Sequence, residues 1–167
     1  HGKVLEQADA VVASLESLVV TPGNYGLIHG DAHPGNFLVD GRTLTFFDFD
    51  DAIYTWFAYD IATILFSVVL NQHVPVDEKA RQSEVRSFLP VFLEGYSKEY
   101  SAGDDMLQHL PLLLKLREFS LYAVIHSHLD IAQLDPDEDW YPIKFLVGRQ
   151  ERLEADVPFI DLDFSRL

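Results

Sequence analysis

The chain has 167 residues, no cysteine and a formal charge of −15, from 12 Lys and Arg against 27 Asp and Glu. At this length one domain buries roughly 70% of the surface that its unfolded chain exposes, so a core forms without disulfides. The negative charge opposes binding to phosphate backbones and anionic lipids, and no apolar run approaches the roughly 18 residues that span a bilayer. The lack of cysteine suits a reducing compartment. We expect a single cytoplasmic domain over residues 1–167, with neither nucleic acid nor a membrane as partner.

The first part of the chain predicts one helix followed by a loop and a β-hairpin. Thr21-Pro22-Gly23 ends the first helical pattern, and Asp40-Gly41 is a typical hairpin turn between two short apolar runs. The segment between these features is too rich in Gly, Pro and polar residues for regular structure. The predicted elements are a helix over 4–19, a strand over 25–28, a loop over 29–36 and hairpin strands over 37–39 and 44–47.

The rest of the chain predicts helices. Apolar residues recur at helical spacing in four stretches: 61–69, ending near 71–75, then 85–96, 112–129 and about 139–153, before an extended tail through Pro158. Pro90 should break the second of these helices, whereas Pro111 suits the first turn of the third, which is apolar on nearly every side. These patterns indicate an α+β, mainly α fold with a central buried helix.

Three oxygen-bearing side chains gather around the predicted hairpin. Asn36 precedes one strand and Asp48 follows its partner, so antiparallel pairing places both at the open end, near Asp31. Phosphoryl transfer from a nucleotide needs an acceptor for the proton of the attacking hydroxyl and oxygen ligands for Mg²⁺. These three residues can supply both.

The motifs here resemble those of the aminoglycoside phosphotransferase and choline kinase family. The resemblance rests on His29-Gly30-Asp31-Ala32-His33-Pro34-Gly35-Asn36, on Phe47-Asp48-Phe49-Asp50-Asp51, and on Trp56 and Tyr59-Asp60-Ile61-Ala62. It implies a protein-kinase-like C-terminal lobe with ATP as phosphate donor and Mg²⁺ as cofactor. By resemblance Asp31 is the catalytic base, Asn36 and Asp48 bind magnesium and the nucleotide, and Asp60 braces the loop.

Two histidines of the loop take further roles. His33 falls where protein kinases carry a lysine that contacts the transferring phosphate, so the resemblance gives it a catalytic position. We expect His29 to lie beneath the loop and to support it by hydrogen bonds. The residue two after Asp48 is Asp50, where protein kinases have a glycine. We therefore do not expect the segment around Asp48 to flip as an activation switch.

The nucleotide-covering lobe of the family has no counterpart in this chain. None of the nine glycines forms a G-x-G-x-x-G loop, and only about 30 residues precede Asp31. We therefore expect the C-terminal lobe of a larger enzyme, nearly inactive by itself. The surface that would meet the missing lobe predicts self-association.

The acceptor is expected to be a hydroxyl of a small, amine-bearing molecule. Asp137, Asp139 and Trp140 form an acidic and aromatic stretch that would receive a cation, as one wall of a substrate pocket. Two alternatives stay open. In the first, the chain is a kinase-like lobe that only binds a ligand. In the second, it is a metal-dependent phosphoesterase, because Gly30-Asp31-Ala32-His33 also resembles the first metal motif of that class.

Overall fold

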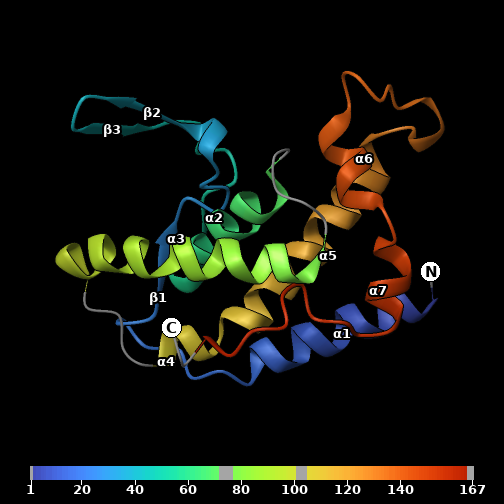
Figure 1. Cartoon of the computed structure of the whole chain (residues 1–167). Coiled ribbons are helices and arrows are strands. Elements are labelled where there is room, and N and C mark those ends of the chain that lie inside the picture. The colour runs from blue at the N-terminus through green and yellow to red at the C-terminus, as the bar shows by residue number, and fades with distance from the viewer. Residues whose placement is uncertain (1, 72–76, 101–104, 165–167) are drawn as a thin grey trace.

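Two helices packed side by side form the centre of the protein. The computed structural model describes residues 2–71, 77–100 and 105–164. Helix α2 (Ala58–Leu70) packs along α5 (Leu110–His128), while α1 (Gly2–Glu16) covers another side of α5 and the long α3 (Glu78–Glu99) packs on α2 (Figure 1). The predicted central helix is thereby confirmed.

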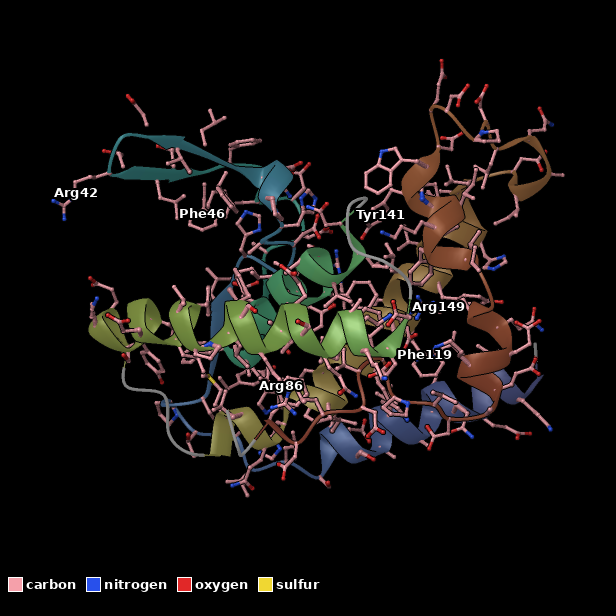
Figure 2. The ribbon with its side chains drawn as sticks, viewed as in Figure 1. Arg42, Phe46, Arg86, Phe119, Tyr141 and Arg149 are labelled. Carbon is pink, nitrogen blue, oxygen red and sulfur yellow. The ribbon has the colours of Figure 1, made fainter. Side chains whose placement is uncertain are left out.

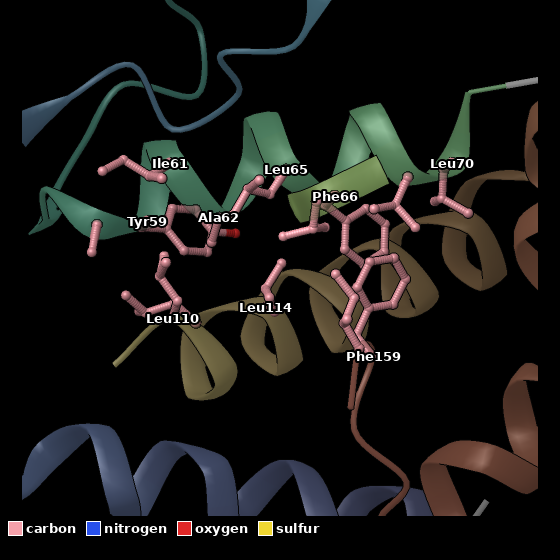
Figure 3. Close-up of a cluster of buried hydrophobic side chains, with 14 of the residues drawn as sticks. Tyr59, Ile61, Ala62, Leu65, Phe66, Leu70, Leu110, Leu114 and Phe159 are labelled. Atoms are coloured by element: carbon pink, nitrogen blue, oxygen red, sulfur yellow. The ribbon is translucent and has the colours of Figure 1, made fainter. Parts of the chain in front are cut away.

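The core lies between α2 and α5. Buried residues of α2 recur every three or four positions, which places Ile61, Leu65 and Phe66 on one face toward Leu110 and Leu114 of α5 (Figure 3). The Phe66 ring stacks on Phe159 from the C-terminal segment, with ring centroids 4.0 Å apart. Burial of such side chains contributes about 1.5–3 kcal/mol each to the free energy of folding, so this layer stabilises the packing of α2 on α5.

The strands form two separate antiparallel pairs. The predicted hairpin is present as β2 (Phe37–Asp40) and β3 (Thr43–Phe46), with Phe37 opposite Phe46. It projects away from the helices (Figure 1). The predicted strand β1 (Tyr25–Ile28) pairs with β4 (Ile53–Trp56), which the sequence analysis did not predict. Because both pairs flank residues 29–36 and 47–52, they fix the ends of the predicted catalytic loop.

The predicted break at Pro90 is wrong, because α3 is continuous through it. Pro90 is exposed, whereas Val85 and Leu89 are fully buried on the opposite side. The carbonyl that the proline ring leaves without an N–H donor therefore faces water, and packing of the buried face maintains the helix.

The single helix predicted over 139–153 is also wrong, because two short helices occupy this region. They are α6 (Trp140–Leu146) and α7 (Arg149–Glu154), separated by Gly148 at φ +60°. A left-handed residue ends a helix, and glycine adopts that conformation without steric cost.

Three short helical elements complete the fold: η1 (Pro34–Asn36), α4 (Asp105–Gln108) and η2 (Ile131–Gln133). The predicted end of the helix near 71–75 falls largely outside the described residues, since 72–76 are not among them. Within the described residues, no helix combines the length and the apolarity that crossing a membrane would require.

Candidate active site

The loop that follows β1 is held from below by one carboxylate. Asp60, in the first turn of α2, accepts the backbone N–H of His29 at 3.0 Å and that of Gly30 at 2.9 Å, one on each oxygen. Burial raises the pKa of Asp60, against the effect of these two donors. Gly30 has φ +80°, and a Cβ there would lie 2.2 Å from the carbonyl oxygen of Asp51. Only glycine fits this turn, which directs Asp31 away from the core.

His29 joins the loop to the end of the hairpin. Its Nε2 donates to the carbonyl of Phe47 at 3.0 Å, and its ring lies 4.6 Å from that of Phe49. The side chain is 7% exposed, so this bond is made away from solvent. The residue therefore connects the segments that carry Asp31 and Asp48.

Three donor side chains surround the Asp31 carboxylate. Asn36 Nδ2 donates to Oδ2 at 3.3 Å and to the Asp31 backbone carbonyl at 3.0 Å. His33 Nε2 lies 3.4 Å from Oδ2. Arg117, from the middle of α5, forms an ion pair with Oδ1. The carboxylate is thus fixed by two loop residues and by one residue 86 positions away in sequence.

The protonation of this cluster follows from its hydrogen bonds. Gly35 donates its backbone N–H to His33 Nδ1 at 2.9 Å, so the neutral ring carries its proton on Nε2, toward Asp31. The hydrogen bond from His33 to Asp31 and the charge of Arg117 outweigh the effect of burial, and together they lower the pKa of Asp31 from 3.8 to about 2. Asp31 is therefore an ionised hydrogen-bond acceptor at neutral pH.

Asn36 and Asp48 lie on either side of the hairpin's open end. The backbone N–H of Phe47 donates to the Asn36 carbonyl at 3.1 Å, and Asp48 follows Phe47 at φ +64°. The Asn36 amide nitrogen faces Asp31, which leaves its side-chain oxygen available to another partner. Asp48 is exposed. Across the described ranges 2–71, 77–100 and 105–164, no three His, Asp or Glu side chains group as ligands for a metal.

A cleft of about 420 Å³ opens beside Asp31. Its walls come from the loop, the end of α2, α5 and α6, and they include Asp31, His33, Ser67, Asn71, Arg117, Leu121, Trp140 and Tyr141. Tyr141 lies on the side of α6 that is turned toward the hairpin (Figure 2). The cleft thus joins the predicted base to an aromatic wall.

The predicted substrate wall is only partly at this cleft. Trp140 lines it, whereas Asp137 and Asp139 are not among its lining residues. Asp139 Oδ2 accepts the backbone N–H of Asp135 at 2.9 Å, and Asp137 donates its own N–H to Asp135 Oδ1 at 2.8 Å. The carboxylates of Asp139 and Asp135 therefore shape the turn before α6.

Sequence reasoning missed Arg117. Arg117 interrupts a mostly apolar stretch of α5, and its side chain is 13% exposed and paired with Asp31. A buried cation needs a partner, and that requirement was the signal that could have singled it out. Its partner could not be read from the sequence, because helix packing brings α5 to the loop.

Comparison with known proteins gives consistent matches. The profile of the group described as "Phosphotransferase enzyme family" matches residues 2–109. Amicoumacin kinase of Bacillus subtilis (strain 168) is 36% identical over 165 residues, which are 99% of this chain and 47% of that protein. A solved amicoumacin kinase in complex with AMP-PNP, Ca²⁺ and Ami has a TM-score of 0.83 at 31% identity, over 99% of this chain and 48% of that one.

A solved microcompartment-associated aminopropanol kinase resembles the chain in fold alone, with a TM-score of 0.62 at 24% identity over 93% of this chain and 46% of the other. The chain therefore spans about half the length of these relatives. The mainly helical α+β fold expected for a kinase-like lobe is confirmed.

Proposed function

This chain belongs to the phosphotransferase enzyme family, and we propose that it is the C-terminal catalytic lobe of an ATP-dependent kinase that phosphorylates a hydroxyl of a small molecule. Membership confirms the family resemblance of residues 29–36 and 47–62 and argues against the phosphoesterase alternative. The observation that carries the proposal is the Asp31 carboxylate, fixed by several donors at the edge of a cleft large enough for a small acceptor.

Asp31 is proposed to accept the proton of the attacking hydroxyl. In phosphoryl transfer the protein mainly positions the groups and balances their charge, so the base need only be ionised and oriented. The lowered pKa of Asp31 keeps it ionised, and its contacts with Asn36 and His33 orient it. His33 stands at the position of the phosphate-contacting lysine of protein kinases, and its hydrogen bond to Asp31 places its ring beside the transfer site.

Asn36 and Asp48 are proposed to hold Mg²⁺. An amide oxygen and a carboxylate suit this hard cation, which also takes oxygens from phosphates and water. The Asn36 amide fits the role, because its nitrogen is engaged by Asp31 and its oxygen is left for a ligand. The metal would neutralise charge on the nucleotide phosphates. The related kinase solved with AMP-PNP and Ca²⁺ supports a nucleotide and a divalent cation.

The acceptor is proposed to be a small, amine-bearing alcohol that binds against Trp140 and Tyr141. An aromatic wall attracts a cation through its ring faces, and the acidic turn at Asp137 and Asp139 lies close in sequence to that wall. The two carboxylates would act through their field at the cleft's rim, not by direct contact. Relatives named for amicoumacin and aminopropanol support a small-molecule acceptor.

The location and partners of the enzyme are proposed from its charge. The charge of −15 favours a cytoplasmic protein that binds neither nucleic acid nor membrane.

The β2–β3 hairpin exposes apolar side chains, at Leu38 65%, Val39 66%, Leu44 51% and Phe46 38%. The N-terminal lobe of the intact enzyme would cover this surface, and the chain alone should self-associate through it.

Nucleotide consumption by the intact protein, measured across a panel of small alcohols with and without Mg²⁺, tests the proposal. Asp31→Asn should lower kcat by roughly 10²- to 10⁴-fold with little change in nucleotide KM. Asp130→Asn is the matched control, because Asp130 is an exposed cap of η2 and should leave turnover unchanged. Undiminished turnover by Asp31→Asn would exclude Asp31 as the catalytic base. Ligand binding without nucleotide consumption would favour the alternative that the chain is a binding lobe.

A further inference from the structure

Arg117 is the one Lys or Arg among the described residues that line the cleft. It lies near the middle of α5, a helix whose buried residues, Glu118 aside, are apolar or aromatic. Its side chain is 13% exposed, and its Nε finds no acceptor among the described residues. A guanidinium so far removed from water, with Asp31 as its paired anion, is fixed by that pairing.

The lone pairs of the Asp31 carboxylate are unequally used. A carboxylate oxygen accepts about two hydrogen bonds. Oδ2 meets two donors, Asn36 Nδ2 at 3.3 Å and His33 Nε2 at 3.4 Å, whereas Oδ1 meets Arg117. One acceptor position on Oδ1 is left, on the oxygen that Arg117 anchors.

We propose that Arg117 is a positioning residue for Asp31: it anchors Oδ1 so that the remaining lone pair of this oxygen receives the acceptor hydroxyl in the cleft. The inference rests on the proposed function, since it assigns the atom at which the acceptor's proton is taken. Without Arg117, the carboxylate can turn part of the way about its Cβ–Cγ bond, which moves the remaining lone pair away from the acceptor hydroxyl. A misplacement of about 1 Å can cost 10²-fold in rate.

Lys115 offers a matched control on the same helix. It is also a cation of α5 with a carboxylate partner, Asp156, but it does not line the cleft. Removal of its charge likewise breaks an ion pair of α5, and it leaves the contacts of Asp31 in place. The test set is therefore Arg117→Met, Arg117→Lys and Lys115→Met.

The first measurement uses the chain itself and needs no turnover. The NMR signals of the Asn36 side-chain amide and of the Asp31 carboxyl carbon report on the carboxylate's position, because Asn36 Nδ2 donates to it. Arg117→Met should shift and broaden both signals, while Lys115→Met leaves them unchanged and Arg117→Lys restores the Asn36 signal in part. Unchanged signals in a folded Arg117→Met protein would overturn the inference without affecting the proposed reaction.

The second measurement uses the intact protein. Arg117→Met should lower kcat by roughly 10- to 100-fold at unchanged nucleotide KM, with Arg117→Lys between it and the wild type. A purely structural role would instead lower the unfolding midpoint and leave kcat per folded molecule unchanged, and that result would overturn the inference. If Asp31→Asn retains turnover, the proposed function fails, whereas the NMR result on Arg117 still stands by itself.

Discussion

A buried ion pair behind the site offers a test of what stabilises this fold. Glu118 is fully buried and Arg149 is 2% exposed, and the two side chains form an ion pair between α5 and α7. Arg149 also donates its Nε to the Phe145 carbonyl at 3.0 Å, and its guanidinium lies 4.5 Å from the centre of the Phe145 ring. Glu118 Oε2 has no partner among the described residues.

The energetic balance of this pair is set by burial. Burial raises the pKa of Glu118 and lowers the pKa of Arg149, so for each group the loss of water exceeds the gain from its partner. Glu118→Met or Arg149→Met alone leaves the other charge buried without a counterion, which costs about 3–5 kcal/mol. Replacement of both by methionine removes both desolvation costs and should leave the protein within about 2 kcal/mol of the wild type.

Urea unfolding of the chain, followed by helical circular dichroism, measures these differences. A total stability of about 5–15 kcal/mol leaves the single variants measurable. The double-mutant cycle should give a coupling energy of at least about 3 kcal/mol. The control cycle uses Glu94 and Lys98, whose side chains are 76% and 68% exposed, and should give less than about 1 kcal/mol. Additive losses at Glu118 and Arg149 would refute the reasoning.

Three further outcomes are expected. The pKa of Glu118 is raised in the folded state, so the folded protein binds this proton more tightly than the unfolded chain does. The wild type should therefore lose stability relative to Glu118→Met as pH rises from the ordinary pKa of Glu through the raised pKa, and below the ordinary pKa this relative loss should vanish. Unfolding measured across pH checks the sign. Gly30→Ala should cost more than about 2 kcal/mol, against about 1 kcal/mol for Gly41→Ala, because a Cβ at Gly41 meets no atom within 4 Å; equal losses would contradict the turn geometry. Pro90→Ala should raise the free energy of unfolding by about 1–2 kcal/mol, while Pro111→Ala in the first turn of α5 changes it by less than about 0.5 kcal/mol; a loss at Pro90 would show that the ring packs favourably.

Local signals carried the prediction of the loop and the hairpin. Asp40-Gly41 specified a turn, and antiparallel pairing then required Asn36 and Asp48 to flank its open end, as the bond between Phe47 and Asn36 shows. Strand β4 gave no such signal, because it has four residues and pairs with β1 across 24 intervening residues. Pro90 misled for the opposite reason, since a strong local signal was outweighed by the packing of Val85 and Leu89.

The charges of α5 illustrate why the rest of the site needed the structure. Arg117 and Glu118 are neighbours in sequence, yet a helix turns by about 100° per residue, so the two side chains leave α5 in different directions. One reaches Asp31 in the site, and the other reaches Arg149 in the interior. The sequence could state that both need partners, because each interrupts an apolar helix. Which partner each finds is decided by how α5 packs against the loop and against α7, and the site is therefore held by the same helix that holds the core.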